Sequence, residues 1–289
     1  MVKTPVTSMT EKKLNEFDYS IFDGITGAMA GIEAYKKFYE QFHNAWDEAQ
    51  KELSLHKFYH TLEVAKLMVE LAPTEELKAI YFWTGMLHDF GRYYDICGGS
   101  FAGTKINHAE VGAEVLFKYR MIKLFPVSEE MYDSIESAVR FHGVLSLEEA
   151  VETAGLQLTE EQWQLCRDIR TADKWDIFKF LIWLPTEVTC GASEEYIAQM
   201  TVSERTMNEL LNHKPIDRGA EEYTNIRWFM SHVGFIYDKN DQRLMNWLHE
   251  TGWVAKYLAK LYECNPKDIE SLKEIQRTAE KYLEDVYVR

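Results

Sequence analysis

The residues best suited to chemistry lie in positions 84–92, which read T-G-M-L-H-D-F-G-R. His88 and Asp89 stand side by side at the end of an apolar run, and Gly91 follows almost at once, so we expect the pair at a helix end. An imidazole and a carboxylate presented together suit a divalent metal ion of borderline hardness. Because His-Asp dipeptides are common by chance, the metal hypothesis depends on what other segments contribute.

Four other segments each place a histidine or an aspartate on an otherwise apolar helical stripe. These side chains are His60, His108, His142 and Asp173. The intervals from 60 to 88, 88 to 108, 108 to 142 and 142 to 173 are 28, 20, 34 and 31 residues. Each interval is roughly one helix plus its connection, so neighbouring helices can bring the side chains to one point.

A lone histidine on an apolar stripe is usually a hydrogen-bonded core residue. Burying four imidazoles and two carboxylates on facing helices without a metal would cost several kcal/mol in unpaired polar groups. The set therefore predicts a metal site. Its donors are nitrogen and oxygen, which fit iron, manganese, nickel or cobalt better than a structural zinc, and the choice among these ions, magnesium and zinc stays open.

The amino-acid composition limits the binding partners and the cellular location that we expect. The 289 residues are 46% hydrophobic, enough for a sizeable core. A formal charge of -15 argues against binding long nucleic acid or an anionic membrane surface. A small anionic substrate remains possible, because a metal ion supplies local positive charge. The four scattered cysteines form no C-x-x-C pair, and we interpret them as reduced thiols of a cytoplasmic protein. We expect no signal peptide and no membrane span, since no long apolar run occurs.

The sequence predicts an all-α protein, with helical patterns throughout and no hairpin signals. We expect helices over about 32–53, 56–71, 75–89, 107–124, 128–142, from 159 onward, and over 193–212, 221–236, 240–262 and 266–287. A glycine-rich loop is expected over 93–106. We divide the chain into an N-terminal segment (1–32), a metal-binding helical core (33–184) and further helices packed on the same core (185–289).

Local phrases around the candidate ligands give a family resemblance. They read Y-H-T-L-E-V-A, G-M-L-H-D-F-G-R, N-H-A-E-V-G-A and R-T-A-D-K-W-D-I. The order H…HD…H…H…D resembles the HD-domain superfamily of metal-dependent phosphohydrolases over about residues 56–181. The resemblance implies an HD-domain helical bundle with the C-terminal helices packed on it.

The resemblance also implies a ligand assignment. His60, His88, Asp89 and Asp173 would hold one metal ion, and Asp89 would bridge to a second. That second ion would be held by His108 and His142, which minimal members lack, so the chain looks like the binuclear branch. No Gly-Tyr-Pro follows the motif, which departs from the cyclic-di-GMP phosphodiesterase branch and makes that substrate doubtful.

The chemistry expected of such a centre is hydrolysis of a phosphate ester. Two divalent ions would share a hydroxide with a pKa of about 7, by analogy with metal-bound water elsewhere. Asp89 would be catalytic by bridging the ions. Arg92 would clamp a phosphate oxygen, although an arginine at a helix C-terminus is also favourable on dipole grounds alone. Lys174 is a candidate substrate contact, and Lys57 and Arg140 could add positive field.

The leading function is therefore a phosphohydrolase acting on a small phosphorylated molecule, such as a nucleotide or a phosphodiester. One alternative is an HD-fold di-iron oxygenase with the same ligand order, which metal identity and oxygen dependence would distinguish. A second is a non-catalytic nucleotide-binding module, which the intact set of six ligands argues against. The sequence leaves the oligomeric state open.

Overall fold

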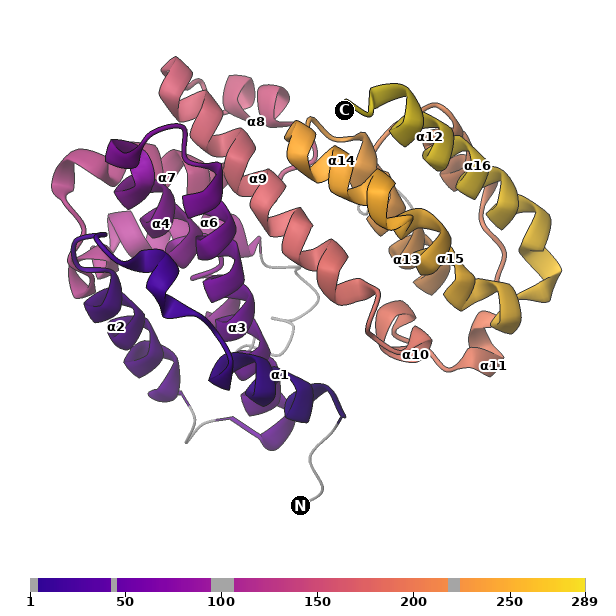
Figure 1. The fold of residues 1–289 in the computed structure, drawn as a ribbon, viewed down its shortest axis with the longest axis horizontal. Coiled ribbons are helices and arrows are strands. Elements are labelled where there is room, and N and C mark those ends of the chain that lie inside the picture. The colour runs from indigo at the N-terminus through magenta and orange to yellow at the C-terminus, as the bar shows by residue number, and fades with distance from the viewer. Residues whose placement is uncertain (1–4, 43–45, 95–106, 218–223, 289) are drawn as a thin grey trace. The chain divides into compact units, whose positions relative to one another are not determined.

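The protein is all-α, as the sequence predicts. A computed structural model describes residues 5–42, 46–94, 107–217 and 224–288, and no strand occurs in these ranges (Figure 1). Among the described helices, none combines the length and the apolar composition needed to cross a bilayer. Cys166, Cys190 and Cys264 are free thiols, whereas Cys97 and most of the expected loop over 93–106 lie outside the described residues.

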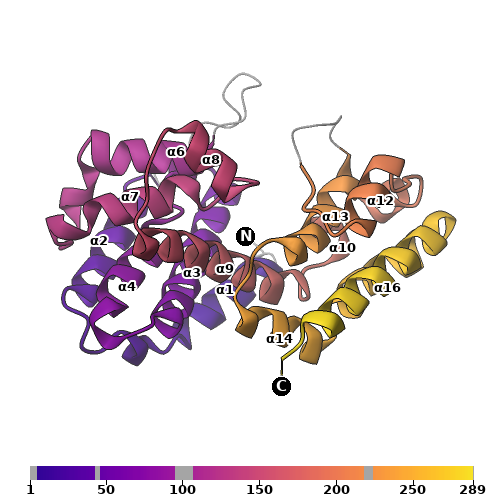
Figure 2. The same cartoon turned by 90° about the horizontal axis from the view of Figure 1, so that it is seen from above.

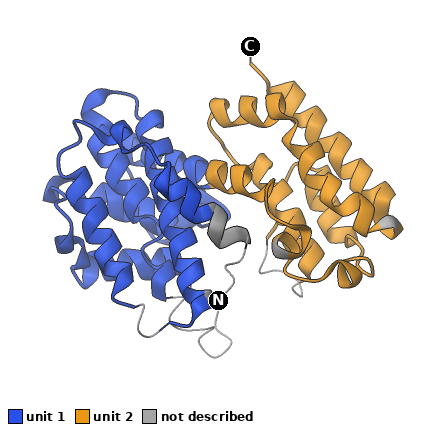
Figure 3. Ribbon diagram, turned by 60° about the horizontal axis from the view of Figure 1, so that its bottom comes forward, with its two compact units in different colours: residues 1–173 blue, residues 174–289 orange. Residues whose placement is uncertain are grey.

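The chain divides into two compact units, residues 1–173 and 174–289 (Figure 3). The buried apolar side chains that the structure describes include one cluster between Phe22 and Val139 and another between Phe178 and Leu283. The division falls inside one long helix, eleven residues before the boundary we expected at 184. That the C-terminal helices also pack on the first core stays a prediction.

Unit 1 contains the predicted metal ligands. Its elements in chain order are α1 (Pro5–Asn15), η1 (Tyr19–Phe22), α2 (Ala28–Glu40), α3 (Glu48–Leu71), η2 (Glu75–Leu77), α4 (Lys78–Leu87), α6 (His108–Ala113), η3 (Glu114–Lys118), η4 (Met121–Leu124), η5 (Glu129–Met131), α7 (Tyr132–Phe141), α8 (Leu147–Thr153) and α9 (Glu160–Leu181), the last continuing into unit 2. Helices α3 and α4 lie side by side, and α6 packs on α7 (Figure 2).

The N-terminal half of unit 1 differs from the expected helices. The sequence suggested a helix over 32–53 and a new one from 56, but α2 ends at Glu40 and α3 runs unbroken from Glu48. A capping box explains the start of α3, because the Asp47 carboxylate accepts from the Gln50 N–H at 2.8 Å and the Gln50 amide accepts from the Asp47 N–H at 2.9 Å. Helix α1 was not predicted.

The expected single helix over 107–124 is also divided. The Asn107 side chain caps the start of α6 by accepting from the N–H of Ala109 at 3.2 Å. The helix then widens into the π-helical segment η3 and stops where Arg120 adopts the left-handed conformation with φ 63°. The 3-10 segment η4 follows, so a helix that looked continuous in the sequence consists of three short pieces.

Unit 2 is a set of helices around its own apolar core. They are α10 (Thr186–Cys190), α11 (Glu194–Ile197), α12 (Glu204–Leu211), α13 (Asn225–Gly234), η6 (Phe235–Tyr237), α14 (Gln242–Thr251), α15 (Trp253–Cys264), η7 (Pro266–Asp268) and α16 (Ile269–Val286). The expected helix over 240–262 breaks at Gly252, whose φ of 61° ends α14. The expected helix over 193–212 likewise splits into α11 and α12, where Ser203 caps the second.

Candidate metal centre

Helix ends supply most of the candidate ligands, as the sequence predicted for the His-Asp pair. His88 is the C-cap of α4, Asp89 lies in the turn that follows, and His142 is the C-cap of α7. His108 is the first residue of α6. His60 and Asp173 lie within the long helices α3 and α9.

Two glycines allow the backbones of these elements to approach closely. A Cβ atom at Gly85 in α4 would lie 2.5 Å from the Cα atom of Ala65 in α3. A Cβ atom at Gly91 would lie 2.0 Å from the main-chain oxygen of His108. Both distances are far below a normal carbon contact, so only glycine permits this spacing. Gly85 thus sets the distance between the helices of His60 and His88, and Gly91 brings His108 to the turn of Asp89.

One side of Asp89 faces a first group, which we define as His60, His88 and Asp173. The Nε2 atoms of His60 and His88 are 3.3 Å apart, and His60 Nε2 is 3.1 Å from Asp173 Oδ1. The Asp89 Oδ2 atom lies 3.7 Å from His60 Nε2 and 3.9 Å from His88 Nε2. The structure therefore brings these four residues to one point from α3, the end of α4 and α9.

The other side of Asp89 faces a second group, which we define as His108 and His142. Their Nε2 atoms are 3.1 Å apart. The Asp89 Oδ1 atom lies 3.3 Å from His108 Nε2 and 3.6 Å from His142 Nε2. The two carboxylate oxygens of Asp89 thus face the two different groups. The sets His60–His88–Asp89 and Asp89–His108–His142 could each hold a metal ion.

Main-chain carbonyls orient two of the imidazoles. His88 Nδ1 donates to the main-chain oxygen of Gly85 at 2.7 Å, and His142 Nδ1 donates to that of Val139 at 2.7 Å. A carbonyl oxygen only accepts, so in the neutral ring the proton resides on Nδ1 and the lone pair of Nε2 points into the centre. This arrangement is typical of histidines that bind metals, and it shows that these residues fit a metal ion.

The electrostatics favour neutral imidazoles. Burial lowers the pKa of His88 to about 4, and the neighbouring carboxylates Asp89 and Asp173 oppose that shift only in part. Burial likewise lowers the pKa of His108 to about 2. Both rings are then uncharged at neutral pH, which is the protonation state that a metal ion requires.

The same electrostatics favour ionised carboxylates. Burial by itself raises the pKa of Asp89, but the charges of Lys57 and Arg92 outweigh it and hold that pKa well below its ordinary value. Burial also acts to raise the pKa of Asp173, and the hydrogen bond and charge of His60 reverse the direction. The centre is therefore preset to receive a cation, with ionised carboxylates at Asp89 and Asp173 and uncharged rings at His88 and His108.

Two of the predicted basic residues lie against Asp89. The Arg92 Nε atom donates to Asp89 Oδ1 at 3.3 Å, while 37% of the arginine side chain remains exposed. The Lys57 ammonium donates to Asp89 Oδ2 at 3.2 Å. Lys57 thus stands on the side of the first group and Arg92 on the side of the second.

The other basic candidates have different partners. Lys174 is buried and forms an ion pair with Asp238, both within unit 2. A substrate phosphate would compete with that carboxylate, so the contact favours a structural role and the substrate contact stays a prediction. Arg140 pairs with Glu136 one turn earlier in α7 at 2.7 Å. Asp176, three residues after Asp173 in α9, is buried.

Sequence reasoning missed Arg170 and the pair Tyr81–Asp168. Arg170 is buried and donates to main-chain oxygens that follow α7. The Tyr81 hydroxyl donates to Asp168 Oδ2 at 2.7 Å and joins α4 to α9. The available signal was their position, because Asp168 and Arg170 are charged residues close to Asp173 in a helix that also carries an apolar stripe.

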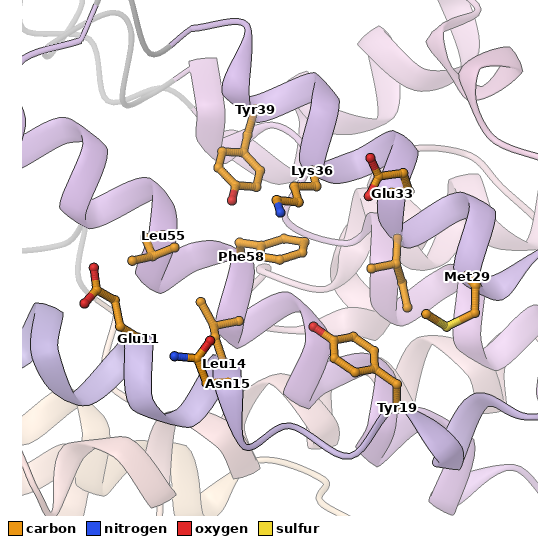
Figure 4. Close-up of a pocket in the computed structure, with 11 residues that line it drawn as sticks. Glu11, Leu14, Asn15, Tyr19, Met29, Glu33, Lys36, Tyr39, Leu55 and Phe58 are labelled. Atoms are coloured by element: carbon orange, nitrogen blue, oxygen red, sulfur yellow. The ribbon is translucent and has the colours of Figure 1, made fainter.

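A cavity of about 580 Å³ lies elsewhere in unit 1, between α1, α2 and α3. Tyr39, Leu55 and Phe58 are among its lining side chains (Figure 4). No member of the metal-binding set lines it. The converging donors are the better candidate site, because chemistry requires reactive groups and not only volume.

Comparison with known proteins adds one finding. Residues 58–176 match the family model described as HD domain. The matched stretch contains every candidate ligand from His60 to Asp173. No curated protein and no solved structure matches the chain.

Proposed function

Since residues 58–176 are an HD domain, a helical domain typical of metal-dependent phosphohydrolases, we propose that this protein is a phosphohydrolase with two metal ions per chain. The observation that carries the proposal is the position of Asp89. Its Oδ2 atom faces the first group and its Oδ1 atom faces the second, at 3.3 to 3.9 Å from four imidazole nitrogens. A carboxylate shared by two groups of donors is able to bridge two metal ions.

The ligands divide accordingly. His60, His88, Asp89 and Asp173 would hold one ion, and Asp89, His108 and His142 would hold the other. When bound, two divalent ions supply Lewis acidity to a phosphoryl oxygen and make water nucleophilic near neutral pH. Manganese, iron, nickel and cobalt suit this mixed nitrogen and oxygen set.

Arg92 is the residue we assign to the substrate. Its Nε atom donates a hydrogen bond to Asp89 Oδ1, and the side chain is partly exposed. A guanidinium presents several N–H donors in a planar fork, so it can bind a phosphate oxygen while it keeps the contact to Asp89. The substrate would be a small phosphorylated molecule, such as a nucleotide or a phosphodiester.

The first experiment is metal analysis followed by a phosphate-release screen. The protein is purified without oxygen or chelator, its metal content per chain is measured by mass spectrometry, and nucleotides and phosphodiesters are then offered with manganese. We expect about two equivalents of metal and release of phosphate that does not depend on oxygen.

Asp89→Ala tests the same proposal at one residue. We expect the variant to lose both metal ions and to lose activity by roughly 10³-fold or more, since no bridge remains. Asp133→Asn, at an exposed carboxylate in the first turn of α7, is the matched control and should change neither quantity. Full turnover of purified Asp89→Ala would show that the proposed site is wrong.

Two other outcomes would favour a function other than phosphate-ester hydrolysis. Iron in the centre together with substrate-dependent oxygen uptake and no phosphate release would identify an oxygenase. Metal well below one equivalent, with none regained from added manganese or iron, would point to a nucleotide-binding module that lacks catalysis.

A further inference from the structure

We propose that Arg170 is a positioning residue that holds His142 at the second metal ion. The inference rests on the proposed two-metal function. It concerns a residue that binds neither metal nor substrate and acts through the main chain next to a ligand.

The contacts of Arg170 are unusually concentrated. Its Nη1 atom donates to the main-chain oxygens of Phe141 and His142, each at 3.2 Å, and to that of Val144 at 2.6 Å. Its Nη2 atom lies 3.4 Å from the main-chain oxygen of Leu145. One guanidinium therefore donates to four main-chain carbonyl groups of the segment over 141–145.

The location explains why an arginine is suited to this role. The last carbonyls of an α-helix have no partner within the helix and carry partial negative charge. Phe141 ends α7, and the Arg170 side chain is buried against this end. A planar cation with several fixed N–H donors satisfies diverging carbonyls that a neutral or shorter side chain could not reach together.

This contact fixes the main chain of a candidate ligand. The main-chain oxygen of His142 accepts from Arg170, and the His142 ring is oriented through Nδ1 by Val139. The ring has both its backbone and its rotation constrained. Without Arg170, the turn that follows α7 would lose its anchor, and the Nε2 atom of His142 would no longer be held 3.1 Å from that of His108.

Arg170 also couples the two groups. It lies three residues before Asp173 on α9, so the helix that supplies a carboxylate to the first group also fixes a histidine of the second. Asp168, two residues before Arg170, accepts a hydrogen bond from Tyr81 of α4, the helix that ends at His88. The stretch over 168–173 thus contacts α4 through Tyr81 and the end of α7 through Arg170.

The test compares metal binding by Arg170→Met with that of the unaltered protein. Titration of the metal-free full-length chain with manganese, followed by calorimetry and by the electron paramagnetic resonance of free manganese, gives two affinities. We expect the ion held by Asp89, His108 and His142 to lose affinity by about 10- to 100-fold, the range found when a residue that supports a ligand is removed. We expect the other affinity to change by less than about threefold, because His60, His88 and Asp173 keep their own contacts.

Arg167→Met is the matched control. Arg167 lies one turn earlier on the same helix, is part exposed, and pairs with Glu160 at 3.7 Å. The same change of side chain there should leave both affinities as they are. Arg170→Lys keeps the charge but not the planar fork, and we expect a second-ion affinity between those of the unaltered protein and Arg170→Met.

Selective loss of the second ion supports the positioning role of Arg170, and each other result overturns it. If the unaltered protein binds two ions and Arg170→Met binds both with unchanged affinity, the positioning role is wrong and the two-metal function stands. An equal loss of both ions in Arg170→Met or Arg170→Lys also overturns it, since this would be a general effect on the fold. If Arg170→Met does not fold by circular dichroism, Arg170→Lys alone decides between selective and equal loss. A single ion in the unaltered protein overturns the two-metal function itself.

Discussion

The two groups of side chains on either side of Asp89 differ in charge. The first group adds the carboxylate of Asp173 to two buried imidazoles, whereas the second group has two imidazoles and no further carboxylate. Their exposure is similar, because 19% of the Asp173 side chain and 15% of the His108 side chain are exposed. A site with more anionic ligands holds a divalent ion more tightly. On the proposed function, we therefore expect the first group to hold its ion more tightly than the second, and the substrate to approach beside the part-exposed Arg92.

Removal of a histidine should have the largest effect on metal content and activity. His108→Ala should lose the more weakly bound metal ion and keep about one equivalent of the tightly bound one. His60→Ala should lose the tightly bound ion as well as activity. For both variants we expect turnover to fall by about 10²-fold or more, because each removes a metal ligand. Metal stoichiometry after dialysis checks the asymmetry, and identical losses in the two variants would contradict it.

Glycine substitution offers a second way to separate the groups. Gly91→Ala would place a methyl group 2.0 Å from the main-chain oxygen of His108, and Gly85→Ala would place one 2.5 Å from the Cα atom of Ala65. Each should lower the free energy of unfolding by about 2 kcal/mol or more, since the obstacle is backbone and not a flexible side chain.

The metal affinities of these glycine variants should differ between the two groups. Gly91→Ala should weaken chiefly the second ion and Gly85→Ala chiefly the first, because each glycine spaces a different pair of elements. Gly155→Ala is the control, since no atom lies within 4 Å of a Cβ atom there. Its φ of 66° makes that variant mildly strained but leaves the centre untouched. Loss of the same ion in Gly85→Ala and Gly91→Ala would contradict the assignment.

The smallest expected effect is on the stability of the metal-free protein with pH. The folded pKa of His88 is lowered to about 4 and that of His108 to about 2, so the unfolded chain binds protons more readily at both sites. Their contribution to stability is complete above the unfolded pKa of about 6.5 and is lost as the pH falls. From pH 7 to 5.5 we expect a loss of about 1 kcal/mol from each histidine.

Urea unfolding at several pH values measures this loss. The contribution of His88 should be exhausted near pH 4, while that of His108 continues to fall towards pH 2. In His88→Asn the slope of the unfolding free energy between pH 6.5 and 4 should be shallower than in the unaltered protein. An unchanged slope would mean that His88 is not held neutral by burial.

The sequence predicted the centre better than the helices around it. The six candidate ligands were found because their residue types are rare on apolar stripes, and the structure brings all six together. Helix breaks were harder to predict, since the capping box at Asp47 and the left-handed Arg120 depend on local backbone contacts that compete with continued helical periodicity. Apolar patterns continue across such breaks and hide them.

Long-range polar contacts were the other gap. Arg170 acts on main-chain oxygens, and every residue has one, so no pattern of side chains marks its target. Lys174 pairs with Asp238, which lies 64 residues further along the chain, and nothing in the sequence around Asp173 marks so distant a partner. The substrate contact expected of Lys174 stays a prediction.

The carbonyl contacts at His88 and His142 have a kinetic consequence. In each case the acceptor lies three residues earlier at the end of the same helix, so the ring is set when the helix forms. The rotational entropy of these side chains is then lost during folding and not during metal capture. On the proposed function, binding of metal to the empty centre should accordingly require no slow rotation of these two imidazole rings.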